Sequence, residues 1–198
     1  PASISTHTVT AFLYNGMAAR PYWNASILAP RFIASAFCSG PAVMIILFQI
    51  LRKTTAMEIK DEAIWKVAEL MAYAMFINLF LLGAELFKEF YSQTQELLYT
   101  QYLWFGIGEH RALVPYAWTS LFASIAAFII FLVPKLRQNW ATLNLGCLLI
   151  WSGVYIEKGI GLIIPGMTPD TLGQIYEYRP SATEWGTAAA VFGIGFLV

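Results

Sequence analysis

Charged residues are scarce in this sequence: they make up 12% of its 198 residues, against about 25% in an ordinary soluble domain. The 12 basic and 12 acidic residues give a formal net charge of zero. Because no basic tract is present that could follow a phosphate backbone, no nucleic acid partner is expected. Apolar residues are abundant instead, at 58% hydrophobic and 16% aromatic. This composition predicts a membrane protein.

Cysteine and histidine are also scarce, with Cys38, Cys147, His7 and His110 in the whole chain. Both cysteines lie in apolar runs without a CxxC pair or a histidine at metal-ligand spacing, so they are predicted to be small buried side chains. Transmembrane haems usually take histidine ligands from helices, and both histidines lie outside the clear apolar runs. We therefore expect this chain to bind no haem or metal.

Long apolar runs define the predicted fold. A helix needs about 20 mainly apolar residues to cross roughly 30 Å of hydrocarbon. A fifth run of this kind begins near Ala182. The four complete runs cover residues 31–51, 67–90, 113–134 and 141–164. The sequence thus predicts an all-α fold, a polytopic transmembrane helix bundle with about five spans.

The chain is interpreted as one transmembrane domain over residues 1–198. Since it begins at Pro1 and stops inside an apolar run, we interpret it as an internal piece of a longer subunit. Residues 1–30 are mixed in character and are predicted to hold the end of a preceding helix and an outward-facing segment.

Lysine and arginine in short loops predict the orientation, because such loops are retained in the cytoplasm. These residues concentrate in 52–66 and 134–140, which are predicted to face the cytoplasm. Residues 1–30, 91–112 and 165–182 are predicted to face outward. We expect a multi-pass protein of the cytoplasmic (inner) membrane, in contact with lipid.

Charged side chains inside the apolar runs are candidate functional residues. A charge at a helix centre costs at least about 2.5 kcal/mol on insertion scales, and such residues usually face a bundle interior. At about 1.5 Å of rise per residue, Glu157 lies on the order of 10 Å, and Glu85 on the order of 8 Å, from the outer ends of their runs. Glu184 opens the fifth run from that side, and His7, unless it is a hydrogen-bonded loop residue, belongs there too. These groups are predicted to share one depth.

Two of the carboxylates have structural alternatives. Glu85 could pair with Lys88 on the next turn of its helix. Ser181 to Glu184 has the S-x-x-E pattern of a capping box, in which the carboxylate returns to a free backbone N–H at the helix start.

Glu157 and Lys158 are neighbours in the stretch GVYIEKGIGLIIPG. Successive residues on a helix point about 100° apart, so the two are predicted not to face each other and to have separate partners. Lys158 could extend its ammonium along the helix toward water. A carboxylate in a partly desolvated pocket is suited to accept and return a proton, and this favours Glu157 for proton transfer.

A quinone suits these residues as a substrate. Its ring and isoprenoid tail need an apolar slot between helices, its carbonyls need a donor, and its protons need a carboxylate with a route to water. The residues assigned to proton chemistry are Glu157, Glu184 and Glu85. Those assigned to the quinone are His7, Lys158, Arg31 and Trp23.

Two other functions are open at this point. A proton or ion conductor would use Glu69 and Asn78 together with Glu85 and Glu157, although Asn78 could instead form a hydrogen bond between helices. A structural membrane anchor for soluble redox subunits would use none of the carboxylates.

Two groups of motifs carry a family resemblance. The first is RPYWNASILAPRFIASAFCSG with the preceding STHTV, and the second is YIEKGIGLIIPG with the later YRPSATEWG. Together they resemble the NrfD/PsrC family, the quinone-interacting membrane subunits of iron–sulfur oxidoreductases, and most closely its DsrP-like members, which belong to the DsrMKJOP complex of sulfur-metabolising prokaryotes. The resemblance implies a subunit of eight to ten helices without haem. It also implies a quinol site near the outward face at the positions of His7, Glu157 and Glu184.

The resemblance also implies partners and a reaction. The subunit is expected to oxidise menaquinol, or another quinol, and to pass the electrons to a ferredoxin-like iron–sulfur subunit on the periplasmic side. Cytochrome c, cytochrome b and cytoplasmic iron–sulfur subunits are further partners that such a complex would supply. Some relatives that resemble proton-translocating members carry an Asp shortly after the histidine. The stretch from His7 to Asn15 has none, so Glu69 and Asn78 are the residues predicted to line a proton path.

Overall fold

Helices joined by loops make up the computed structural model, which describes residues 2–94, 96–170, 172–177 and 180–197. Within that part of the chain, four helices are long and apolar enough to cross a membrane. They contain or closely match the four complete predicted runs, and the polytopic helix bundle is confirmed. Their bounds are Leu28–Thr54, Asp61–Ser92, Val114–Leu132 and Trp140–Met167.

The last of these spans is composite, because α7 continues through a π-helical turn, η2, into the short helix α8. The elements in chain order are α1 (Ala2–Asn15), η1 (Pro21–Trp23), α2 (Leu28–Thr54), α3 (Asp61–Ser92), α4 (Leu97–Trp104), α5 (Val114–Leu132), α6 (Pro134–Arg137), α7 (Trp140–Lys158), η2 (Gly159–Ile163), α8 (Ile164–Met167) and α9 (Ala182–Leu197).

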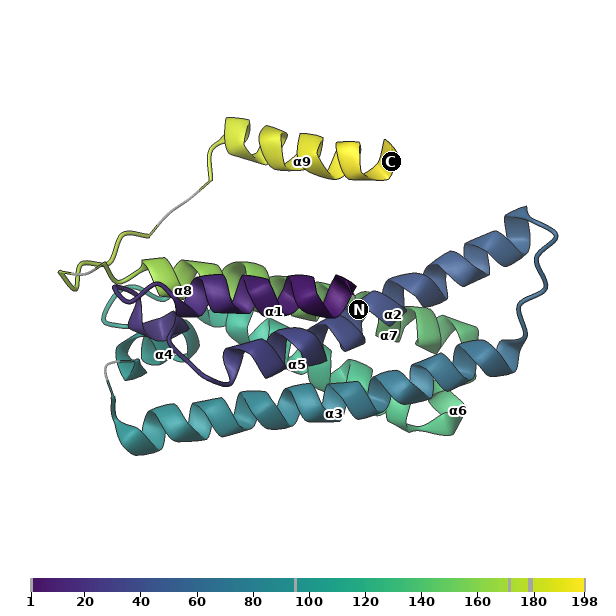
Figure 1. Cartoon of the computed structure of the whole chain (residues 1–198), viewed down its shortest axis with the longest axis horizontal. Coiled ribbons are helices and arrows are strands. Elements are labelled where there is room, and N and C mark those ends of the chain that lie inside the picture. Colours follow the sequence, from purple (N-terminus) through teal and green to yellow (C-terminus); the bar gives the residue numbers. More distant parts are fainter. Residues whose placement is uncertain (1, 95, 171, 178–179, 198) are drawn as a thin grey trace.

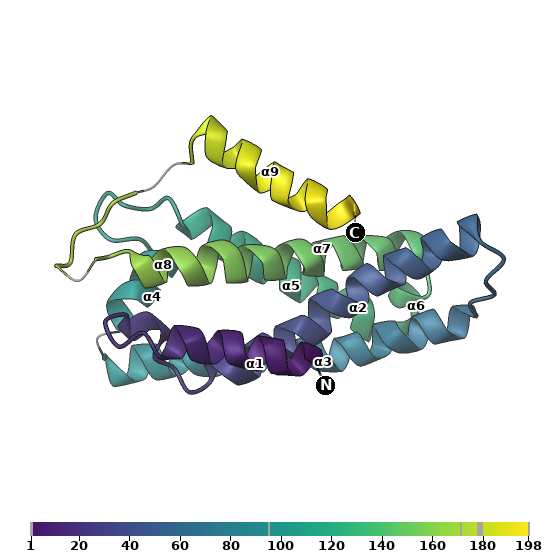
Figure 2. The ribbon, with the colours of Figure 1, turned by 45° about the horizontal axis from the view of Figure 1, so that its top comes forward.

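The four spans lie side by side, with α2 against α3 and α7, and α5 against α3 and α7. The helix α1 packs along α2 (Figure 2). The C-terminal end of α3 lies at the same end of the bundle as α4 and α8, while α6 lies toward the opposite end (Figure 1). The loops predicted to share a side of the membrane therefore share an end of the bundle.

Small residues bring α5 and α7 close together. Ser120 Oγ donates a hydrogen bond of 2.8 Å to Gly153 O, and a Cβ at Gly153 would lie only 3.0 Å from Ser124 Oγ. Small side chains at helix interfaces allow this kind of close approach in membranes. Cys38 and Cys147 are free and buried in the same core, which confirms the prediction for both.

A segment before α2 holds the C-terminal end of the fourth span. Pro165 has no N–H to donate to Gly161 O four residues earlier, and the Tyr22 hydroxyl donates to that oxygen instead, at 2.9 Å. Trp23 Nε1 donates to Leu162 O, also at 2.9 Å. Burial raises the pKa of the Tyr22 hydroxyl well above its ordinary value, so the hydroxyl keeps its proton and remains a donor.

The two ends of the described chain differ from the bundle. Residues 2–15 form a helix, as predicted for the end of a preceding one. The helix α9 begins at Ala182 as predicted, and its 16 residues run to Leu197. It lies apart from the bundle in Figure 1, whereas its C-terminal part approaches α7 in Figure 2, where the rings of Phe192 and Tyr155 lie 6.1 Å apart. The fifth run is therefore helical from its predicted start, and its role as a span stays a prediction.

Candidate functional site

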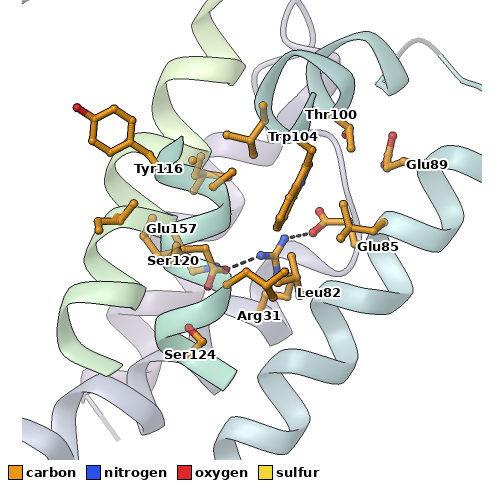
Figure 3. Close-up of a pocket in the computed structure, with 18 of the residues that line it drawn as sticks. Arg31, Leu82, Glu85, Glu89, Thr100, Trp104, Tyr116, Ser120, Ser124 and Glu157 are labelled. Carbon is orange, nitrogen blue, oxygen red and sulfur yellow. Dashed lines mark hydrogen bonds and ion pairs between the residues drawn. The ribbon is translucent and has the colours of Figure 1, made fainter. Parts of the chain in front are cut away.

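Arg31 joins three helices at the centre of a buried charge cluster (Figure 3). From α2, its Nη2 donates to Glu157 Oε1 of α7 at 2.5 Å, and its Nη1 forms an ion pair with Glu85 Oε2 of α3. The Arg31 side chain is only 8% exposed, and both carboxylates are largely buried. Buried charges of this kind require partners with good geometry, and the planar guanidinium can serve two carboxylates at once.

Lys158 completes the cluster, since its Nζ lies 3.0 Å from Glu157 Oε1. The prediction that Glu157 and Lys158 do not face each other is therefore wrong. Their Cα–Cβ directions diverge, but the long, flexible lysine side chain reaches back to the carboxylate, while Nζ lies 5.1 Å from the centre of the Phe32 ring. Glu157 thus has two cationic partners, and the two cations and two carboxylates of the cluster balance.

The cluster lines an internal cavity of about 50 Å³. One water molecule needs about 10–15 Å³, so the cavity has room for a few waters. Arg31, Glu85, Glu157 and Lys158 form its charged wall. Tyr22 of η1 and residues of α3, α4, α5, α7 and η2 form the other walls. They include Leu82, Thr100, Trp104, Tyr116, Ala117, Ser120, Leu121, Ser124 and Gly161.

Glu89 lies one turn beyond Glu85 on α3 and lines the same cavity. Its side chain is 6% exposed; Oε1 is 3.4 Å from Lys88 Nζ, and Oε2 is buried without a hydrogen-bond partner in the described part of the chain. The sequence interpretation missed Glu89 because it lies next to Lys88 near a predicted helix end. Its i, i+4 spacing from Glu85 was the available signal, because that spacing puts both on one helix face.

An apolar groove lies on the other side of Lys158. It has a volume of about 310 Å³ and is lined by Ser39, Trp151, Val154, Tyr155, Lys158 and Gly159. The rings of Trp151 and Tyr155 are stacked 5.8 Å apart. Among the residues that the structure describes, Lys158 alone lines both this groove and the cavity. It therefore forms the boundary between an apolar surface and the buried charges.

Comparison with known proteins supports the predicted resemblance. Residues 1–169 match the family model described as "Polysulphide reductase, NrfD". The chain belongs to the NrfD family.

Two curated relatives align with the whole chain. The first, 26% identical over 217 residues, is a putative membrane subunit of dimethyl sulfoxide reductase from Halobacterium salinarum. The second, 22% identical over 210 residues, is a subunit of selenate reductase from Mesobacillus selenatarsenatis. The chain covers 49% and 47% of their lengths, so it spans about half the length of the curated relatives it matches. Neither relative is named as a DsrP protein, and the placement in that branch stays a prediction.

Three predicted site residues of this NrfD chain lie away from both the cavity and the groove. His7 is partly buried on α1 and lines neither the cavity nor the groove. Trp23 is fully buried, because its indole packs against Gly166. Glu184 is exposed and accepts from Ser181 N at 2.6 Å, which confirms the capping box. Of the groups predicted at one depth, the structure brings together Glu85 and Glu157.

The two residues predicted to line a proton path also lie outside the cavity. Glu69 is at the other end of α3, where it pairs with Lys66 at 3.1 Å and Arg137 at 3.0 Å. Asn78 is buried, and its Oδ1 accepts no hydrogen bond from the described residues. An interhelical hydrogen bond to that oxygen is therefore not seen.

The alternative pairing of Glu85 with Lys88 is also wrong. Glu85 pairs with Arg31, whereas Lys88 Nζ approaches Glu89 and Glu96. The described residues contain no group of three His, Cys, Asp or Glu side chains that could hold a metal ion, and the absence of haem and metal stays a prediction.

Proposed function

We propose that this chain is the quinone-interacting part of a membrane subunit in a reductase complex. It oxidises menaquinol, or another quinol, near the outward end of the bundle and passes the electrons to an iron–sulfur partner subunit. The observation that carries the proposal is the position of Lys158, which lies between an apolar groove and a buried charged cavity. Membership of a family of reductase membrane subunits supports it.

The groove and the cavity suit different parts of the reaction. Small-molecule sites are mainly apolar and have volumes of roughly 300–1,000 Å³, and the groove beside Trp151 and Tyr155, at about 310 Å³, falls in that range. The cavity, at about 50 Å³, suits water and protons. We place the quinone ring in the groove, where Lys158 Nζ donates a hydrogen bond to a ring oxygen.

Glu157 holds Lys158 in place for this contact and is also the carboxylate nearest to it. When a quinol O–H bond breaks, Glu157 is the first available acceptor on the cavity side of Lys158. Because Arg31 and Lys158 both stabilise its ionised form, Glu157 is suited to pass a proton on rather than to keep it.

Replacing Lys158 by methionine tests the quinone contact. A charge-assisted hydrogen bond contributes about 1.5–3 kcal/mol, so we expect roughly ten- to hundredfold weaker binding of a quinone analogue to the assembled complex. Fluorescence quenching or calorimetry with the analogue measures the affinity. Lys53 lies in the last turn of α2, at the opposite end of that helix from Arg31. Lys53→Met is the matched control and should bind the analogue with the parent affinity. Equal affinity of Lys158→Met and the parent would remove Lys158 from the site.

Replacing Glu157 by glutamine separates the proposal from the two alternatives. We expect quinol oxidation per assembled complex to fall by about 10²–10⁴-fold, the usual effect of losing an acid–base group. A purely structural anchor predicts no change in that rate. Proton uptake by the reconstituted protein without any quinol, lost in the same variant, would favour a proton conductor instead.

A further inference from the structure

Glu89 is a carboxylate beside the charge cluster that pairs with neither cation of the cluster. Arg31 forms ion pairs with Glu85 and Glu157, and Lys158 forms a second ion pair with Glu157. Glu89 lines the same cavity but has Lys88 alone close to one oxygen, and its other oxygen is buried without a protein partner in the described chain. Buried polar atoms are nearly always hydrogen-bonded. A carboxyl group placed in this way is suited to hold a proton.

The position of Glu89 connects the cavity with the outward end of the bundle. On its outer side, Lys88 Nζ lies 3.4 Å from Glu89 Oε1 and 3.6 Å from Glu96 Oε2. The Lys88 side chain is 47% exposed, so this cluster reaches the surface. On its inner side, Glu89 follows the Arg31–Glu85 pair along α3, with Thr100 nearby (Figure 3).

Glu157 and Glu89 both line the cavity, which therefore connects the two carboxylates. Two further wall atoms, Arg31 Nε and Ser124 Oγ, are buried without protein partners among the described residues. A few water molecules fit the volume of about 50 Å³, and such buried waters bond to otherwise unpartnered polar groups. A proton can move along hydrogen bonds of this kind from one carboxylate to the other.

We propose that Glu89 takes up the proton that the quinol releases into the cavity and delivers it to the outward surface beside Glu96. This inference rests on the proposed function and adds a proton-transfer residue to it. As each quinol O–H bond breaks, its electron pair stays on the quinol oxygen, and the ring gives up two electrons in total to the iron–sulfur cluster of the partner subunit. The proton forms an O–H bond on the Glu89 carboxylate, and that bond breaks when the proton passes to water outside.

The test is quinol oxidation and proton release by the whole complex carrying Glu89→Gln. We expect both rates to fall about a hundredfold, while the affinity for a quinone analogue stays within twofold of the parent value. Glu89→Asp keeps a carboxylate and should recover the rates to within tenfold of the parent. Glu62→Gln, an exposed glutamate at the start of the same helix, is the matched control and should turn over at the parent rate.

Rates are taken per assembled complex, so a loss of yield does not imitate a loss of proton transfer. If Glu89→Gln releases protons and oxidises quinol at the parent rate, Glu89 has no such role. If Glu89→Asp is as slow as Glu89→Gln, or the analogue affinity falls together with the rate, the effect is structural or reflects quinone contact, and the inference is overturned. A parent complex that neither binds the analogue nor oxidises quinol would contradict the proposed function itself.

Discussion

Replacing Arg31 by leucine should strongly destabilise the bundle, because Glu85 and Glu157 would lose the cation that they share. Removing one partner of a buried ion pair typically costs about 3–5 kcal/mol, since it leaves an uncompensated buried charge. We expect a large fall in the thermal midpoint of the detergent-solubilised protein and in the fraction that assembles. Thermal unfolding and the yield of assembled complex measure the two effects.

The Arg52–Asp61 pair is the matched control for this experiment. It also joins an arginine of α2 to a carboxylate of α3, but its side chains are 35% and 43% exposed. Exposed pairs contribute about 0–1 kcal/mol, so Arg52→Leu should have a small effect. Adding Glu85→Gln and Glu157→Gln to Arg31→Leu should recover much of the stability, because no buried charge then remains unpaired. If Arg31→Leu is as stable as Arg52→Leu, the buried cluster does not form.

Replacing Gly166 by alanine should disrupt the contact between Trp23 and the end of the fourth span. A Cβ at position 166 would overlap the Cε2 and Nε1 atoms of Trp23, so the fully buried indole must move. Overpacking of this kind costs about 1–3 kcal/mol, and loss of the hydrogen bond from Trp23 to Leu162 O adds about 1 kcal/mol. Thermal unfolding in detergent measures the change.

Gly83→Ala provides the comparison, because a Cβ there meets nothing within 4 Å and Gly83 lies inside α3. Alanine is the better helix former by about 1 kcal/mol, so this variant should be at least as stable as the parent. Combining Gly166→Ala with Trp23→Phe should restore part of the loss, since the smaller ring leaves room for the methyl group. Equal stability of the two single alanine variants would show that Trp23 does not pack on Gly166.

The helices were largely predictable because each depends on its own residues. All four complete runs, at 31–51, 67–90, 113–134 and 141–164, fall within or very close to observed helices. The helix predicted at 67–90 begins earlier, at Asp61, because the acidic residues Asp61 and Glu62 are favourable in a first helical turn, beside the positive end of the helix dipole.

The site was predictable in part. Glu85, Glu157 and Lys158 stand out as charges in apolar runs, and the structure brings them together around Arg31. Glu89 was missed because it lies next to Lys88 near a predicted helix end, and because the sequence does not show that residues of α4 would line a cavity with it.

The amino-acid sequence by itself determined that this chain is a membrane protein, which runs form helices, and how far each charge lies from a helix end. These properties follow from composition and from the rise of about 1.5 Å per residue along a helix. The tertiary structure alone decided which charges pair, that Trp23 is buried against Gly166, and that Lys158 separates the groove from the cavity. Those features depend on how each helix is rotated and which neighbour it packs against, and a single run of residues does not contain that information.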